Sequence, residues 1–124
     1  MTNIKKQINH IINACKYSIQ GIRTAFSEEL AFRQDVFLFF LGSFLAVIMP
    51  ITTELKLLLY ISLILILISE LINTAIEKTI DRIGLEFHEL SKKAKDIGSA
   101  IVFVSLLNAL FLWVFIFFKY VILV

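Results

Sequence analysis

Residues that make turns and cross-links are scarce in this sequence. Its 124 residues include one proline, four glycines and one cysteine. A lone cysteine, Cys15, excludes an intrachain disulfide and a cysteine-based metal site. The scarcity of glycine and proline leaves little material for the turns of a β-rich fold. These absences favour an all-α protein, and the length allows one domain over 1–124.

Charge is scarce as well, and it is unevenly distributed. Hydrophobic residues make up 59% of the chain and the mean hydropathy is +0.88, values typical of proteins solvated by lipid. Residues 36–53 and 97–118 carry no charge, and Glu70 is the only charged residue within 57–76. Each stretch approaches the roughly 20 residues that cross a bilayer. We therefore expect three transmembrane helices, at about 35–51, 57–77 and 96–118.

The basic residues predict the orientation of these helices. Ten of the twelve lysine and arginine residues precede the first expected span or lie between the second and third, and only Lys56 and Lys119 lie on the other side. Because lysine and arginine concentrate in cytoplasmic loops, the N-terminus and a 78–95 loop are expected in the cytoplasm and the C-terminus outside. Pro50 marks a short break between the first two spans.

The segment before the first span, residues 1–30, has apolar residues at helical spacing. These are Ile4, Ile8, Ile11, Ile12, Cys15, Ile19, Ile22 and Phe26. Lysine, arginine and amide residues lie between them, and no acid occurs before Glu28. The pattern predicts an amphipathic surface helix in the interface of an anionic leaflet. The alternative is a helix that packs on the bundle of its own chain.

Glu70 is the strongest functional candidate from residue chemistry alone. A carboxylate at membrane depth costs free energy unless it has a partner or a wet cavity, so its presence suggests a function. Glu70, Asn73, Thr74, Glu77 and Asp81 share one helix face, which we call the polar seam. Three spans offer little interior to hide this seam from lipid. A homo-oligomer with seams between protomers is one solution.

Two further charged regions favour phosphate and metal chemistry. Glu28 and Glu29 precede the first span and are suitable oxygen ligands for Mg²⁺. Residues 78–96 mix cations and acids as a phosphate site does, although an ordinary solvated loop has the same composition. The four glycines are isolated, so the sequence has no nucleotide-binding P-loop. The net charge of +2 gives no reason to expect a nucleic-acid partner.

Longer motifs resemble those of one family. They are Tyr17-Ser18, Gly21, RTAF at 23–26, ELAFRQ at 29–34, ELINTAIE at 70–77, DRIG at 81–84 and EFHELSKKAKDIGS at 86–99. Together they closely resemble the signature of the small prokaryotic integral-membrane diacylglycerol kinases, in register over nearly the entire chain. Chance similarity between apolar helices does not reproduce these polar positions.

The resemblance implies a homotrimer in the bacterial inner membrane that transfers the γ-phosphate of MgATP to diacylglycerol. Glu70 matches the general base of the family, and Glu29 and Glu77 match its Mg²⁺ ligands. The positions that match ATP-binding residues are His10, Tyr17, Glu29, Asn73, Glu77, Glu86, Phe87, His88, Lys95 and Asp96. Those that match the lipid site are Ser18, Arg23, Ala31, Arg33, Asp35, Lys56, Glu70, Ser99 and Trp113. His10 replaces a usual arginine, and Asp35 a usual glutamate.

Two other functions are compatible with the sequence. The sister family of undecaprenol kinases shares Glu70, Asn73, Glu77, His88 and Lys95-Asp96, so these residues do not select the lipid. Glu89-Leu90-Ser91 and Gly98-Ser99 resemble the diacylglycerol type and favour that substrate. A non-enzymatic alternative is an oligomeric ion-conducting subunit in which Glu70 carries protons. Such a subunit has no need of the charged 78–96 segment.

Overall fold

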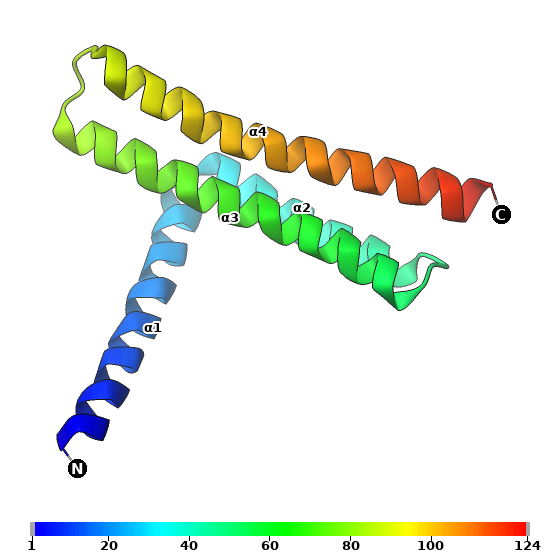
Figure 1. Cartoon of the computed structure of the whole chain (residues 1–124), viewed down its shortest axis with the longest axis horizontal. Helices are drawn as coiled ribbons and strands as arrows, with labels where there is room; N and C mark the ends of the chain where they lie inside the picture. The colour runs from blue at the N-terminus through cyan, green and yellow to red at the C-terminus, as the bar shows by residue number, and fades with distance from the viewer. Residues whose placement is uncertain (1, 124) are drawn as a thin grey trace.

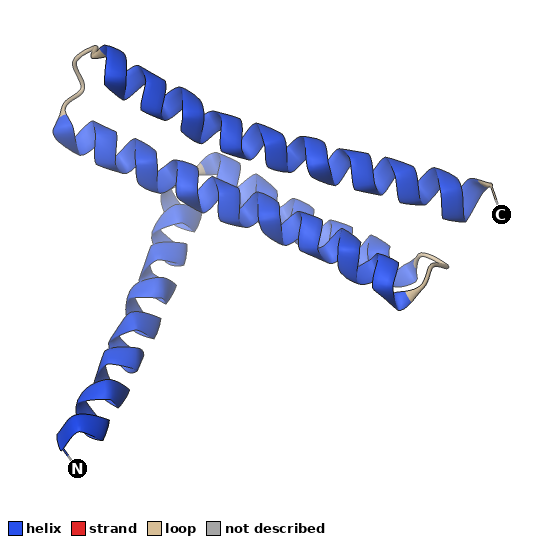
Figure 2. Ribbon diagram, in the orientation of Figure 1, coloured by secondary structure: helices blue, strands red, loops and turns tan. Residues whose placement is uncertain are grey.

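The chain folds into helices only over the part that the computed structural model describes, residues 2–123. Figure 2 shows helices joined by short loops. In chain order they are α1 (Thr2–Glu28), α2 (Leu30–Ile48), α3 (Thr53–Ile83), α4 (Glu89–Phe117) and a final π-helical turn, η1 (Phe118–Ile122). The prediction of an all-α protein is confirmed.

Three of these helices form a bundle that is long and apolar enough to cross a membrane. They are Leu30–Ile48, Thr53–Ile83 and Glu89–Tyr120, the last including part of η1. The central helix α3 packs against both α2 and α4 (Figure 1). The predicted number and order of apolar helices is confirmed, and each contains most of the corresponding expected span.

The helices extend further than the expected spans. α3 continues to Ile83 and α4 begins at Glu89, so only residues 84–88 separate them. Most of the predicted 78–95 loop is therefore helical, because its lysine and glutamate residues are good helix formers. The His88 side chain caps α4, since its Nδ1 accepts a hydrogen bond from the Leu90 N–H at 3.2 Å.

The turn between α2 and α3 occupies residues 49–52 and includes the predicted break at Pro50. Lys56, in the first turns of α3, donates a hydrogen bond from Nζ to the Val47 carbonyl at 2.6 Å. This bond satisfies a carbonyl at the C-terminal end of α2, where no intrahelical donor is available. Lys56 therefore ties the two helices together at this end of the bundle.

The first helix, α1, leaves the bundle at a steep angle (Figure 1). Ala25 near its C-terminal end is buried, whereas its large apolar side chains from Ile4 to Ile22 are exposed. Over most of its length α1 thus does not pack on the bundle of its own chain, which removes that alternative. Its position on a membrane surface remains a prediction.

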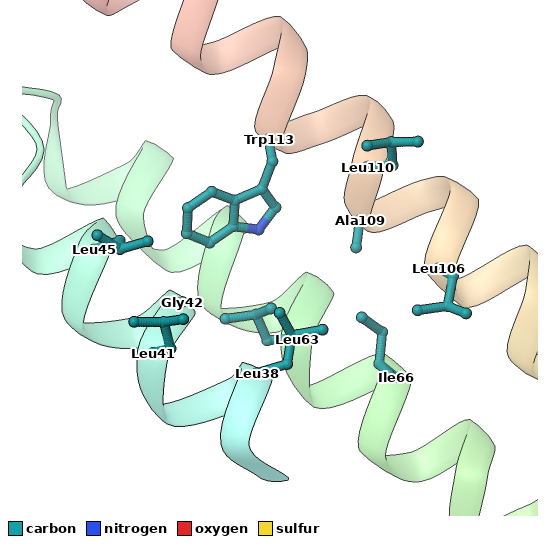
Figure 3. A pocket seen from close by; sticks show the side chains of 10 residues that line it. All are labelled: Leu38, Leu41, Gly42, Leu45, Leu63, Ile66, Leu106, Ala109, Leu110 and Trp113. Atoms are coloured by element: carbon teal, nitrogen blue, oxygen red, sulfur yellow. The ribbon is translucent and has the colours of Figure 1, made fainter. Parts of the chain in front are cut away.

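An apolar groove of about 420 Å³ lies between α2, α3 and α4 (Figure 3). Gly42 of α2 lines this groove. Helices α2 and α3 are closely packed there, because a Cβ added at Gly42 would lie 2.7 Å from Leu63 Cδ1. The indole of Trp113 projects from α4 beside this contact, and Leu106 and Ile66 also line the groove.

Candidate active site

The polar seam lies on the inner face of α3. Glu70 is 6% exposed, and Asn73 and Thr74 are also buried. Asn73 donates a long hydrogen bond from Nδ2 to Glu77 Oε1 at 3.5 Å, while its Oδ1 is buried without a partner. A buried carbonyl oxygen that accepts no hydrogen bond costs free energy unless a ligand or a water molecule binds to it. The amide oxygen of Asn73 is therefore a candidate ligand atom.

Helix α4 comes close to the polar seam at Gly98. A Cβ on Gly98 would lie 2.6 Å from Asn73 Oδ1, so only glycine fits without a shift of the neighbouring atoms. The next residue, Ser99, lines a cavity of about 240 Å³ together with Glu70 and Asn73. The fold thus brings Ser99, predicted at the lipid site, beside the predicted base.

Glu70 lines this cavity, and three further carboxylates lie near enough to act on its charge. The negative charges of Asp35, Glu77 and Glu29 all act on the Glu70 carboxylate. Asp35 lies in α2 and Glu77 in α3. Glu29 is the N-cap residue of α2 and lies between α1 and α2. Like charges at close range repel each other, so the cluster favours a bound cation.

The donor atoms of the cluster fit Mg²⁺. Carboxylate and amide oxygens are hard ligands, and Glu29, Glu77 and Asn73 provide both kinds. Over residues 2–123 no group of three or more His, Cys, Asp and Glu side chains surrounds a common centre. Mg²⁺ does not require one, because it is commonly held by one or two carboxylates and completed by water and substrate phosphates.

The hinge between α1 and α2 is held by two cations from the bundle. Lys78 of α3 pairs with Glu28 Oε2 at 2.6 Å and with Glu29 Oε1 at 3.2 Å. Arg33 donates from Nη1 to the carbonyl oxygens of Phe26 at 2.9 Å and Ser27 at 3.0 Å. Arg33, predicted at the lipid site, thus binds the C-terminal end of α1 in this chain. The pairing of Lys78 was missed from the sequence because its partners lie about fifty residues away.

A polar pocket of about 290 Å³ forms where α3 connects to α4. Five predicted ATP-binding residues line it, namely Glu86, Phe87, His88, Lys95 and Asp96. Lys95 Nζ pairs with Asp81 Oδ1 at 2.6 Å, and Lys92 pairs with Asp96 at 2.6 Å. Asp81 follows Glu77 by four residues, about 6 Å along the helix axis. The polar pocket therefore adjoins the cluster of carboxylates.

Other predicted residues lie far from the polar seam within one chain. His10 is eighteen residues before Glu28, the last residue of α1, about 27 Å along the helix axis. Lys56 and Trp113 are each fourteen residues from the Glu70–Ser99 level, about 21 Å along α3 and α4. Tyr17 and Arg23 are exposed on α1, and Ala31 is exposed at the start of α2. Ser18 faces α3 across a cavity of about 500 Å³ that Thr74 and Lys78 also line.

Comparison with known proteins gives consistent matches. Residues 16–117 match the family model described as prokaryotic diacylglycerol kinase. The chain is 42% identical over 112 residues to diacylglycerol kinase of Haemophilus influenzae, covering 86% of this chain and 90% of the relative. It is 40% identical over 113 residues to diacylglycerol kinase of Escherichia coli strain K12, covering 91% and 93%. It is 44% identical over 99 residues to diacylglycerol kinase of Pseudomonas aeruginosa, covering 80% of each chain.

Proposed function

The chain belongs to the prokaryotic diacylglycerol kinase family, and we propose that it transfers the γ-phosphate of ATP to diacylglycerol, giving phosphatidic acid and ADP. One observation carries the mechanism. Glu70 is a buried carboxylate within a predicted span, beside a cavity that shares Leu106 with the apolar groove. A lipid hydroxyl that never leaves the membrane needs its base at such a place.

The apolar groove gives the lipid a place to lie. Leu106 lines both this groove and the cavity that contains Glu70, and Ile66 of the groove is one helical turn from Glu70. A diacylglycerol hydroxyl near Glu70 therefore leaves an acyl chain in contact with leucine, isoleucine and tryptophan side chains. Because the acyl chain is already in hydrocarbon, these side chains orient it by van der Waals packing and not by the hydrophobic effect.

In the reaction, the lipid hydroxyl oxygen forms a bond to the γ-phosphorus while the bond from that phosphorus to the bridging oxygen of ADP breaks. The Glu70 carboxylate accepts the hydroxyl proton, and ADP leaves with its charge on the β-phosphate. Phosphoryl transfer depends mainly on positioning and charge stabilisation. Lys95, in the polar pocket near Glu77, is suited to hold the phosphates of ATP.

Mg²⁺ is the metal that this proposal requires. Glu29 and Glu77 would hold it with the Asn73 amide oxygen, whose lack of a hydrogen-bond partner supports the assignment. When bound, the ion neutralises the phosphate charges that the cluster of carboxylates would otherwise repel. Glu70 would then lie near the positive charge of the ion. In the described residues it forms no ion pair with a lysine or arginine.

We further propose a homotrimer in the bacterial inner membrane, with the N-terminus in the cytoplasm. His10 and Tyr17 of α1 match ATP-binding positions but do not line the polar pocket of their own chain, which supports a site completed by a second protomer. The excess of basic residues around the two predicted cytoplasmic segments supports the orientation.

A lipid phosphorylation assay tests the proposed function. Purified chain in mixed micelles with diacylglycerol and labelled ATP is expected to transfer label to the extracted lipid when Mg²⁺ is present. Absence of labelled lipid from folded, oligomeric protein would contradict the proposal. It would leave the ion-conducting alternative, which a proton-flux assay in vesicles then tests.

A further inference from the structure

Three charged side chains meet at the α1–α2 hinge, and the proposed reaction gives a role to only one of them. We call Glu28, Glu29 and Lys78 the hinge clasp. The Lys78 ammonium lies 2.6 Å from Glu28 and 3.2 Å from Glu29. Glu29 is a proposed metal ligand, whereas Glu28 has no role in the proposed reaction. The hinge clasp therefore links a proposed metal ligand to an acid outside the cluster.

Lys78 is the cation that Glu29 pairs with in the described residues 2–123. Arg33, the other cation at the hinge, has its Nη1 bound to the carbonyl oxygens of Phe26 and Ser27. The Lys78 side chain is 43% exposed and sits at the end of a flexible stem, so it can move between the two carboxylates. An ammonium beside Glu29 attracts the same oxygens that a divalent cation would use.

We propose that Lys78 is a displaceable counter-ion of Glu29, and that Glu28 is a positioning residue that retains Lys78 when a divalent cation binds. This inference rests on the proposed function, in which Glu29 is a metal ligand. Without metal, Lys78 neutralises Glu29 and keeps it directed toward the bundle. With metal, Glu29 binds the ion, and Lys78 stays paired with Glu28 alone. Glu28 thereby lowers the cost of displacing Lys78.

The two members of the pair should then have opposite effects on metal affinity. Lys78→Met removes the competing charge and is expected to tighten metal binding by about threefold or more. Glu28→Gln leaves Glu29 as the only partner of Lys78, so it is expected to weaken metal binding by about the same factor. In the double variant Glu28 has no lysine to retain, and the affinity should equal that of Lys78→Met.

Mn²⁺ binding to the full chain in detergent micelles, followed by electron paramagnetic resonance without nucleotide, measures these affinities independently of activity. Lys78→Arg keeps the charge and should bind Mn²⁺ like the unmodified chain. Lys93→Met is a matched control, because Lys93 pairs with Glu89 at 2.8 Å on α4, and its loss should leave Mn²⁺ affinity unchanged. Size-exclusion chromatography and circular dichroism establish that each variant is folded, and Lys78→Gln replaces Lys78→Met if the latter does not assemble.

The double variant decides between the proposal and a general charge effect. If Glu28→Gln weakens Mn²⁺ binding equally with and without Lys78, Glu28 acts only through its own charge and the proposal is overturned. Unchanged or weaker binding by Lys78→Met also overturns it, while leaving the proposed function intact. If Glu29→Gln and Glu77→Gln do not alter Mn²⁺ binding, the metal site itself is wrong, and both the inference and that part of the proposed function fail.

Discussion

Glu70 illustrates what a single residue contributes in this fold. The residue lies in an apolar helix, is 6% exposed and has other acids nearby, and it forms no ion pair with lysine or arginine in the described residues. A structural carboxylate at such a position would normally have a cationic partner. The absence of one supports a role in proton transfer rather than in stability.

Replacement of Glu70 by glutamine is expected to abolish most phosphoryl transfer. The amide keeps the size and polarity of the side chain but cannot accept the hydroxyl proton, so kcat should fall by about 10²- to 10⁴-fold. Glu54→Gln is the matched control, because Glu54 lies in the first turn of α3 at the opposite end of the bundle. Steady-state rates in mixed micelles measure both. Near-normal turnover of the Glu70→Gln protein would exclude Glu70 as the general base.

Glu29 and Glu77 should respond differently from Glu70. Glutamine at either position removes one anionic oxygen ligand, so the Mg²⁺ concentration for half-maximal activity should rise by about tenfold, together with a lower maximal rate. Glu70→Gln should not shift this concentration to a comparable extent. Titration of activity with Mg²⁺ at fixed ATP measures the effect. An unchanged Mg²⁺ requirement in both variants would contradict their assignment as ligands.

At the scale of elements, the close approach of α4 to α3 forms the site. Gly98 allows this approach, since its α-carbon faces the Asn73 amide oxygen that we propose as a metal ligand. The apolar stretches 57–76 and 97–118 predict both helices. The sequence does not reveal which residues of the two helices touch, because the helical period indicates a face but not its partner. The contact between Gly98 and Asn73 therefore required the structure.

Gly98→Ala tests this helix contact. The added methyl group must displace Asn73 or separate the helices, so we expect a loss of about 1–3 kcal/mol in the free energy of unfolding. Catalytic activity should fall as well. Gly21→Ala is the control, since nothing lies within 4 Å of a Cβ there and alanine is the better helix former. Denaturation in mixed micelles measures both, and equal stability of the two variants would contradict the close contact.

The extent of the helices shows why part of the fold was not predictable. The charge-free stretches predict three apolar helices, because exclusion of charge from lipid is a local property of the sequence. The same rule places the ends of the spans at the first charged residues, as at Glu77. α3 continues to Ile83, since helix formation does not stop where the lipid stops. The hinge clasp was also unpredictable, because Glu28 and Lys78 meet only through the packing of three helices.

At the scale of the whole molecule, one chain brings together only part of the predicted site. Glu70, Asn73, Glu77 and Ser99 meet, and the polar pocket gathers the residues of the α3–α4 connection. The α1 residues His10 and Tyr17 and the distant Lys56 and Trp113 do not reach them. The large apolar side chains of α1 from Ile4 to Ile22 are exposed, as expected of a helix on a membrane surface. A second protomer is the partner that we propose for His10, Tyr17, Lys56 and Trp113.

Subunit mixing tests this assembly. A Tyr17→Ala protein and a Glu70→Gln protein, each inactive alone, should regain activity when they are mixed and allowed to exchange subunits. Activity returns only if one protomer supplies α1 and another supplies Glu70 to the same site. Cross-linking in detergent should give a closed trimer. Full activity of a monomer, or no recovery on mixing, would contradict a shared site.

The choice of lipid is the most direct test of the central claim, because the resemblance assigns Glu70, Asn73 and Glu77 to diacylglycerol and undecaprenol kinases alike. The decisive measurement compares initial rates on diacylglycerol and undecaprenol presented at equal surface fraction to the same purified protein. Discrimination should come from residues that line the lipid site rather than from the phosphate pocket. We predict faster phosphorylation of diacylglycerol, with both rates lost in Glu70→Gln. A faster rate on undecaprenol would contradict the proposed substrate.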